Sequence, residues 1–280
     1  MAGKRQADDR LWMNLEVRGS EFQDTRLRRR FAILLEKLWN GMGQTIPFAC
    51  QDWASTKGAC RILSDDRVSE HDIRHFQASS ERVKATGGPV LILQDTTTFS
   101  YQRERPELIG HTGKTTLRTG NYGVGPRQPL TQCGILMHSS LVVTADGLPL
   151  GLAAVKFWTR KQFKGAYELK RHINPTRVPI EEKKSWRWLE NTRQSTGLLD
   201  DPVRCIHIGD RESGIYELLC IAYDLRTHFL VRTCFDRLAG DGQNTISKAM
   251  QHVQLKGPHR VELRDAKGRP MTATLELRYS

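Results

Sequence analysis

The sequence lacks long apolar runs and closely spaced cysteines. No stretch approaches the roughly 18 apolar residues of a membrane-spanning helix, and the N-terminal MAGKRQADD has no apolar signal-peptide core. The six cysteines include no Cys-x-x-Cys pair, and most stand among apolar residues, which indicates free buried thiols in a reducing compartment. Internal repeats and low-complexity segments are also missing. We therefore expect a cytosolic globular protein without a membrane partner.

The balance of charge is strongly basic, with 43 lysines and arginines against 31 acidic residues and a formal net charge of +12. Such an excess favours a polyanionic partner or an anionic membrane surface. At 280 residues, of which 38% are hydrophobic, the chain is long enough for about two domains with a real core.

Residues 1–85 are predicted to form a small, basic, all-α module. From Asp24, a suitable N-cap, apolar residues recur at the one-face spacing of a helix between Leu27 and Leu38. Cations near a helix N-terminus oppose the macrodipole, so an anionic partner would relieve them; a solvated charged face is the alternative. Four arginines crowd the first turns of this helix: Arg26, Arg28, Arg29 and Arg30.

Further helices are expected within the module. Pro47 suits the first turn of a second helix, and a third covers residues 53–63 and carries Lys57 and Arg61. A fourth is expected before residue 85. Together these helices could hold basic side chains against double-stranded DNA.

The segment PVLILQDTTTFSY, residues 89–101, predicts a buried strand that ends in an acid. An apolar run, Val90 to Leu93, leads to Asp95, and hydroxyl residues follow as far as Ser100. We therefore expect Asp95 where the strand opens into a polar loop. A carboxylate in that position needs an arginine, backbone N–H groups or a divalent metal ion to compensate it.

A second segment has the same form. Residues 203–209, VRCIHIG, predict a strand that leads into Asp210, and Arg211, Glu212 and a helix follow. Two strand-end acids in one α/β domain are the hard oxygen ligands of a two-metal phosphoryl-transfer site, whose ions lie about 4 Å apart. The alternative is two surface acids that cap a loop and a helix N-terminus.

The pattern between residues 87 and 233 predicts a mixed-sheet layered fold. Residues 104–129 are polar and rich in glycine, which predicts a long loop. A hairpin is expected at Asp146-Gly147. The strands and helices expected after the loop are strands at 132–144 and 148–158, a helix at 179–194, a strand at 203–209, a helix at 213–225 and a strand at 227–233.

Several single residues carry further expectations. His138 and His207 lie inside apolar strands and are expected to be hydrogen-bonded core histidines. Trp158 and Arg160 close a long strand and are candidates to line a DNA channel. The other candidate DNA contacts outside the helical module are Arg118, Arg127 and Lys161.

The segments LILQDTTTFSY and HIGDRESGIYE, with DTRLRRR and WASTKGACRIL before them, resemble the DDE transposases of the insertion-sequence family numbered four, in particular the Tn-five-like cut-and-paste enzymes. The resemblance implies an α/β protein with an RNase H-like mixed-sheet catalytic domain at residues 87–233. A helical domain at residues 1–85 would bind the transposon ends, and residues 234–280 would begin a β-rich insertion. It also implies a bacterial, nucleoid-associated protein that forms a homodimer at synapsis.

The resemblance implies a set of site residues. Asp95 and Asp210 would be two of three catalytic acids that hold two Mg²⁺ ions, for which Mn²⁺ can substitute, with Arg211, Glu212 and Tyr101 in support. The implied reaction is hydrolysis at the transposon ends and transfer of the freed 3′-OH to target DNA. The residues that would bind DNA are Arg26, Arg28, Arg29, Arg30, Lys57 and Arg61.

The third catalytic acid of this family has no counterpart in the sequence. In the family it is a Glu on a helix beyond the β-rich insertion, in a Tyr-Arg-Glu context. Glu262 and Glu276 fall instead on strands of a solvent-facing hairpin predicted around Lys267-Gly268. We therefore expect a C-terminally truncated transposase. Two alternatives stay open, a DNA-binding remnant that occupies transposon ends without cutting them and an RNase H-like nuclease unrelated to transposition.

Overall fold

The computed structural model describes residues 13–279 except 15, 19, 23, 70–72, 74, 102–107, 119–126, 161–177 and 241. The chain divides into two compact units, Met1–Arg232 and Thr233–Ser280. The first unit contains both the N-terminal helices and the central sheet.

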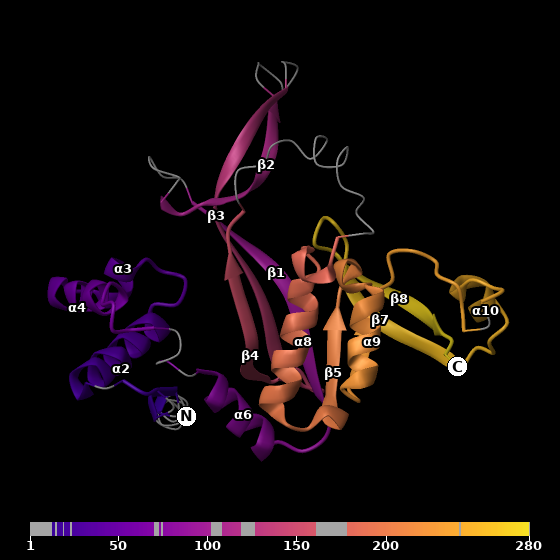
Figure 1. The fold of residues 1–280 in the computed structure, drawn as a ribbon, viewed down its shortest axis with the longest axis horizontal. Coiled ribbons are helices and arrows are strands. Elements are labelled where there is room, and N and C mark those ends of the chain that lie inside the picture. Colours follow the sequence, from indigo (N-terminus) through magenta and orange to yellow (C-terminus); the bar gives the residue numbers. More distant parts are fainter. Residues whose placement is uncertain are drawn as a thin grey trace. The chain divides into compact units, whose positions relative to one another are not determined.

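Three N-terminal helices, α2 (Thr25–Asn40), α3 (Ile46–Cys50) and α4 (Trp53–Leu63), pack around a small core of their own (Figure 1). Asp24 is the N-cap of α2, as predicted, and accepts a hydrogen bond from the backbone N–H of Arg26 at 2.7 Å. Pro47 lies in the first turn of α3, which confirms the second predicted helix. The buried residues that the three helices share are Leu34, Cys50, Ala59 and Ile62.

A six-stranded mixed sheet forms the centre of the first unit. β3 pairs antiparallel with β1, β2 and β4, whereas β5 runs parallel to β1 and to β6. This arrangement confirms the predicted α/β fold with a mixed sheet. The strands are β1 (Val90–Ser100), β2 (His111–Arg118), β3 (Arg127–Thr144), β4 (Pro149–Trp158), β5 (Cys205–Gly209) and β6 (His228–Val231).

Two predictions about the sheet are wrong. Residues 104–129, expected to be a long loop, include β2 and the first residues of β3, which pair as antiparallel strands. β1 does not end near Asp95 but continues to Ser100, because Thr96 to Ser100 pair with residues 134–138 of β3. Threonine is β-branched and favours strands, so the run of hydroxyl residues extends the strand and does not form a loop.

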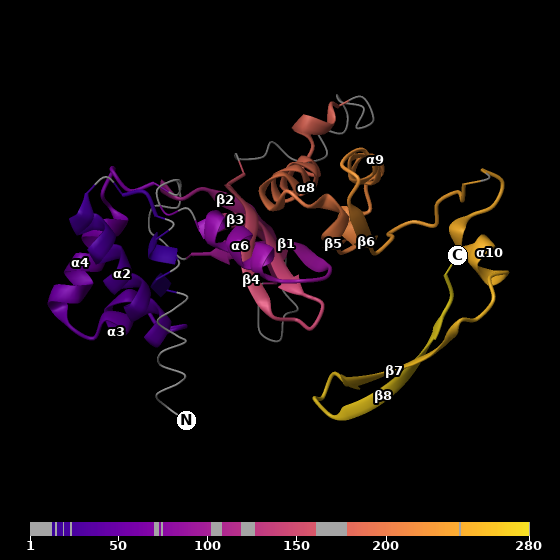
Figure 2. The ribbon, with the colours of Figure 1, turned by 90° about the horizontal axis from the view of Figure 1, so that it is seen from below.

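Helices α6 (His75–Ala85) and α8 (Trp186–Leu199) pack on one face of the sheet. Val83 of α6 and Leu199 of α8 share a buried cluster with Val90, Ile92 and Val142 of β1 and β3. Helix α9 (Tyr216–Asp224) packs beside α8, and Figure 2 shows both helices on the same side of β5 and β6. The helix expected at 179–194 is instead a short 3₁₀ turn, η3 (Ile180–Glu182), followed by α8.

Side chains alternate along β1 between two faces. Val90, Ile92 and Gln94 are buried on the side of α6 and α8. Leu91 and Leu93 are half-buried on the opposite face, and Asp95 is exposed there. Asp95 therefore lies on the face opposite the two helices.

The second unit holds α10 (Ile246–Gln251) and an antiparallel hairpin of β7 (Gly257–Arg264) and β8 (Pro270–Leu277). The hairpin was predicted and α10 was not. Gly268 has φ +78° in the turn, a conformation that favours glycine. Glu262 and Glu276 lie on these strands, as predicted, and both are exposed. None of the described helices is long and apolar enough to cross a membrane.

Candidate functional site

The structure brings Asp95 and Asp210 to the same edge of the sheet. β1 and β5 run parallel, and their last paired residues are Gln94 and Gly209, which directly precede the two acids. Because neighbouring strands lie about 4.8 Å apart, the backbones of Asp95 and Asp210 are neighbours. Both side chains are exposed. Two carboxylates are thus presented to solvent from two rigid, adjacent strands.

The turn after β5 fixes Asp210. Its Oδ1 accepts a hydrogen bond from the backbone N–H of Glu212 at 2.9 Å, so Asp210 caps the short 3₁₀ helix η5 (Arg211–Ser213). The hydroxyl of the buried Ser213 donates to the backbone carbonyl of Asp210 at 2.6 Å. Asp210 therefore has the capping role that the sequence analysis gave as the alternative. It also orients the carboxylate, so it does not exclude a ligand.

Gly209 packs tightly beneath this turn. A Cβ there would lie 2.3 Å from the Ser213 hydroxyl oxygen and 3.1 Å from the Trp188 ring, and both side chains are buried. Gly209→Ala is therefore expected to lower the free energy of unfolding by about 2 kcal/mol and to displace Asp210. Urea denaturation measures the loss.

The matched control for Gly209→Ala is Gly197→Ala, within α8. A Cβ at Gly197 meets nothing within 4 Å, and alanine favours a helix interior by about 0.5–1 kcal/mol over glycine. This variant should be slightly stabilised. Equal effects of the two substitutions would contradict the packing described for Gly209.

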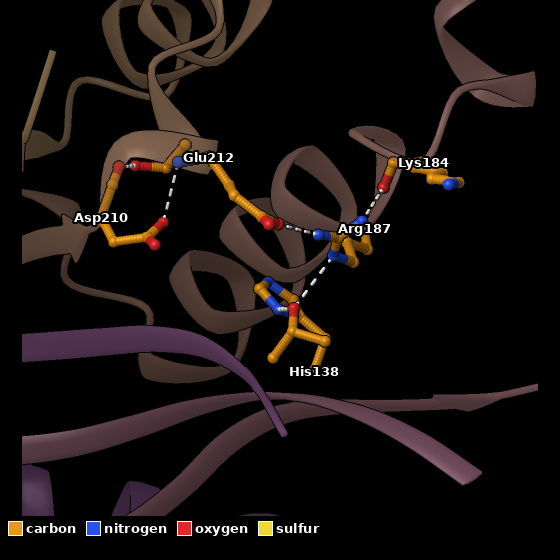
Figure 3. Close-up of polar contacts among 7 residues, drawn as sticks. His138, Lys184, Arg187, Asp210 and Glu212 are labelled. Atoms are coloured by element: carbon orange, nitrogen blue, oxygen red, sulfur yellow. Dashed lines mark hydrogen bonds and ion pairs between the residues drawn. The ribbon is translucent and has the colours of Figure 1, made fainter. Parts of the chain in front are cut away.

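Arg187 connects β1 to the turn after β5 (Figure 3). Its Nε donates to the hydroxyl of Thr96 at 3.1 Å, and its Nη2 donates to Glu212 at 2.6 Å. Its Nη1 donates to the backbone carbonyl of Lys184. Thr96 follows Asp95, and Glu212 lies two residues after Asp210. The Arg187 side chain, only 11% exposed, thus links β1 and the turn after Asp210 to the first turn of α8.

Sequence reasoning missed Arg187 because it placed the helix start at residue 179, in which case Arg187 would fall in the middle of the helix. Because the helix starts at Trp186, Arg187 lies in its first turn, where a cation opposes the helix macrodipole. The same feature had identified the arginines of α2 as candidates.

The surroundings of Arg187 are apolar and electropositive. Its guanidinium lies over the Trp158 and Trp188 rings, at 5.5 Å and 5.9 Å from their centroids. Burial lowers the pKa of Arg187, the Glu212 carboxylate opposes that shift, and Arg160 adds to it. The ion pair with Glu212 therefore partly offsets the desolvation of the guanidinium.

The two core histidines behave largely as predicted. His207 bonds Gln94 through Nδ1 at 3.1 Å and Thr196 through Nε2 at 3.0 Å, and burial lowers its pKa to about 4. His138 bonds the Thr96 hydroxyl through Nδ1 at 2.9 Å. Burial, and secondarily Arg187, lowers the pKa of His138 to about 3. Both imidazoles are therefore neutral parts of the core at neutral pH.

Asp95 and Asp210 provide carboxylate oxygens, which are ligands of the type that Mg²⁺ prefers. Mg²⁺ is commonly held by one or two carboxylates together with waters and substrate phosphates, so Asp95 and Asp210 fit one such ion. Among the described residues, no group of three or more His, Cys, Asp or Glu side chains could hold a metal ion. A second ion would need ligands beyond this pair.

The three residues expected to support the acids have different positions. Glu212 pairs with Arg187, and Arg211 is exposed in η5. Tyr101 follows the end of β1 and lies about 20 Å along the strand from Asp95. The supporting role of Tyr101 stays a prediction.

The six cations predicted to bind DNA are all exposed. Four lie on the first turns of α2 and two on α4. Arg28 also donates to the backbone carbonyl of Ser20 at 3.1 Å, which links it to the chain before α2. Of the other candidate contacts, Lys161 lies outside the described residues, and the side chains of Arg118 and Arg127 are not described.

The comparison with known families concerns this helical part. A family model described as transposase DNA-binding matches residues 9–68. The matched segment includes α2, α3 and α4, and with them all six predicted cations. No curated protein matches the chain. The match shows that the N-terminal helices are similar to the DNA-binding part of transposases, and it supports DNA as the partner of these helices.

Proposed function

We propose that the chain is a DDE-type transposase of the insertion-sequence family numbered four. Its helical part binds transposon ends, and an RNase H-like sheet carries Asp95 and Asp210 for Mg²⁺-dependent cleavage and strand transfer. The observation that supports the catalytic part is the β1–β5 register, whose last pair, Gln94 and Gly209, directly precedes the two acids. The mixed order of the sheet, with parallel strands beneath the acids, supports the RNase H-like assignment.

The residues of the chain have separable tasks in this proposal. Asp95 and Asp210 hold the ion at a fixed edge of the sheet, and Arg187 keeps Glu212 and the turn after Asp210 in place. Mg²⁺ supplies Lewis-acid stabilisation of the charge that develops on the phosphodiester oxygens. Because phosphoryl transfer depends mainly on positioning and charge neutralisation, two paired strands are a suitable support.

Binding of Mn²⁺ to the protein in the absence of DNA tests the acid pair directly. The electron paramagnetic resonance signal of free Mn²⁺ should decrease when the full chain is added. Asp95→Asn and Asp210→Asn should each abolish most of this decrease, because each removes one of two carboxylate ligands. Undiminished Mn²⁺ binding in both variants would contradict the proposed site.

DNA binding is assigned to the first turns of α2. Combined replacement of Arg28, Arg29 and Arg30 by glutamate should weaken binding of a fluorescent duplex. It should also reduce the slope of log K against log salt by about 3, since each phosphate contact contributes about 0.9. Fluorescence anisotropy at several salt concentrations measures both effects.

The control for this triple variant carries the same change in charge outside the matched segment. Glutamate replaces three exposed cations on or next to α6, α8 and α9, namely Lys84, Arg193 and Arg226. If both triple variants lose the same slope, binding reflects net charge and not the helical part.

A DNA-binding remnant is a second candidate function. The described residues provide two acids and no third, which favours binding without efficient cutting. If the chain is such a remnant, it should protect transposon ends in a footprinting experiment, and it should not nick them in the presence of Mg²⁺. A nuclease unrelated to transposition predicts nicking without preference for inverted ends.

A further inference from the structure

Helix α4 has a buried face and an exposed face of different chemistry. Its buried face contributes Ala59 and Ile62 to the core that the three N-terminal helices share. On the other face, three residues spaced by four, Trp53, Lys57 and Arg61, are all exposed. Because successive residues of an α-helix are rotated by about 100°, these three side chains lie within about 80° of one another.

Trp53 is a large apolar side chain that water surrounds. Its exposed fraction is 78%, and it is the first residue of α4. A single exposed aromatic residue is ordinary on a protein surface, but this one shares its helix face with two cations. A partner that covers the indole ring would gain the free energy of burying it. The two cations indicate that this partner is an anion.

The acidic residue next to Trp53 does not oppose such a partner strongly. Asp52 is the N-cap of α4 and accepts a hydrogen bond from the backbone N–H of Ser55 at 2.7 Å. Its carboxylate also lies 3.9 Å from the ammonium group of Lys37. The charge of Asp52 is therefore partly compensated within the helical part.

Cations of α2 lie across a groove from α4. This groove, of about 230 Å³, is lined by Arg30 and Lys37 of α2 and by small residues of α4 that include Ala54 and Gly58. A Cβ at Gly58 would meet nothing within 4 Å, so the surface of α4 is open at that position. A polyanion could thus approach α4 closely and meet cations on both helices (Figure 1).

The dimensions and the position of α4 suit the major groove of DNA. Its 11 residues span about 16 Å, and the major groove, about 12 Å wide, admits one helix. In helix-turn-helix proteins, the N-terminal residues of the recognition helix contact base edges, while another helix crosses the backbone. Trp53 is at the N-terminal end of α4, and α2 carries the arginines expected to bind phosphates.

The apolar ring of Trp53 is suited to one particular group of the major groove. Base edges there carry hydrogen-bond donors and acceptors, and their one apolar group is the 5-methyl of thymine. An indole offers a single N–H donor, so it cannot form the bidentate pairs by which arginine recognises guanine and asparagine recognises adenine. Contact with a thymine methyl group is therefore the base contact that Trp53 fits.

We propose that α4 is the recognition helix of this chain and that Trp53 is a specificity-determining residue, which packs on the 5-methyl group of a thymine in the major groove. Lys57 and Arg61 bind backbone phosphates beside it. The inference rests on the proposed function, because it takes the helical part as the DNA-binding part. It adds a preference for base sequence, which phosphate contacts alone do not supply.

The variants that test Trp53 differ in the ring that they retain. Trp53→Ala removes the ring and should fold, because the side chain is exposed and alanine favours a helix. Trp53→Phe keeps an apolar ring. The matched control is Tyr223→Ala, at an aromatic residue of α9 that is 84% exposed and lies outside the segment of the family match. Circular dichroism and thermal melting check the fold of each variant.

Salt dependence separates the apolar contact from the ionic ones. A 20-base-pair duplex is first selected from a randomised pool with the unaltered full chain, and binding is measured by fluorescence anisotropy. Trp53→Ala should weaken binding by about tenfold and leave the slope of log K against log salt unchanged, because the indole carries no charge. Lys57→Gln should instead lower this slope by about 1.

Replacement of thymine by uracil tests the methyl contact itself. Each thymine of the selected duplex is replaced in turn, which removes one methyl group and keeps the hydrogen-bonding pattern. At one position, the replacement should weaken binding of the unaltered chain by about fourfold, the effect expected for one buried methyl group. Trp53→Phe and Tyr223→Ala should show the same loss at that position, and Trp53→Ala should show none.

Three results would overturn the proposal. The first is a selected duplex in which every uracil replacement has the same effect on the unaltered chain and on Trp53→Ala. The second is a randomised pool from which no preferred sequence emerges. The third is unchanged DNA binding by Trp53→Ala together with loss of a dimer in sedimentation equilibrium, which would assign the ring to a contact between two copies of the chain.

Failure of this inference can be told apart from failure of the proposed function. A chain that binds duplexes with a salt-dependent affinity, but whose uracil effects do not depend on Trp53, retains the proposed DNA binding and loses only the recognition role of Trp53. A chain that binds no duplex contradicts both.

Discussion

Asp95→Asn and Asp210→Asn are each expected to lower Mg²⁺-dependent nicking of transposon-end DNA by about 10³-fold or more. Asparagine keeps the size of the side chain but removes the negative charge that holds the ion, and the stabilisation supplied by a catalytic metal is worth several kcal/mol. Single-turnover nicking of a labelled duplex gives the rate. DNA affinity, measured by anisotropy, should change less than twofold, because the predicted DNA contacts lie on α2 and α4.

The matched control for these substitutions is Asp146→Asn. Asp146 is an exposed aspartate in the tight turn between β3 and β4, where Asn-Gly is as favourable as Asp-Gly. Its nicking rate should equal that of the unaltered chain. Retained nicking in Asp95→Asn or Asp210→Asn would remove the acids from the mechanism. An unaltered chain that binds transposon ends but never nicks them would instead support the DNA-binding remnant.

Arg187→Ala is expected to lower the free energy of unfolding by about 3 kcal/mol. The substitution removes three hydrogen bonds from a side chain that is 11% exposed, and with them the contacts to Trp158 and Trp188. Arg187→Lys keeps the charge, but a single ammonium cannot reach all three acceptors, so about half of the loss should remain. Urea denaturation with a common slope measures both variants.

Arg193→Ala is the matched control for Arg187→Ala. Arg193 lies on the same helix and over a tryptophan ring, that of Trp186 at 5.1 Å, but is exposed. Exposed cation–π contacts are worth about 0.5–1 kcal/mol, so the loss should be small. Equal losses of unfolding free energy at both positions would show that the hydrogen bonds of Arg187 to Thr96 and Glu212 add no stability beyond the contact with the tryptophan rings.

The parts of the fold that could be predicted are those set by local patterns. Asp24 capped α2, residues 53–63 formed α4, and the turn at Asp146-Gly147 joined β3 to β4, because capping, helical periodicity and turn chemistry depend on neighbouring residues. Asp95 and Asp210 were also recognisable as candidates, since each follows a short apolar run, although β1 continues beyond Asp95. Their proximity, however, depends on the pairing of β1 with β5, which no local pattern specifies.

Two of the errors have a common physical origin in pairing between distant segments. Thr96 to Ser100 and residues 111–118 were expected to be loop because they are polar, yet both pair with β3, which satisfies their backbone groups. The helix start at Trp186 was misplaced for a different reason, because residues 180–182 follow Pro179 and are of types that occur in helices, although they form a separate 3₁₀ turn. As a result, Arg187 was absent from the predicted site.

The buried polar contacts of Gln94 have a consequence for how the two acids reach their places. Gln94 is buried, and its Nε2 lies 3.0 Å from the Thr192 hydroxyl and 3.1 Å from Nδ1 of His207. A slip of β1 by one residue would turn Gln94 out to solvent and drive Asp95 against α8, leaving these partners unsatisfied. The hydrogen bonds of Gln94 thus fix the register of β1. The two carboxylates become neighbours only when the strands of the sheet have paired in this register. The site is therefore assembled by global folding and not by ordering of a local loop, so its amides should exchange with solvent as slowly as those of the core.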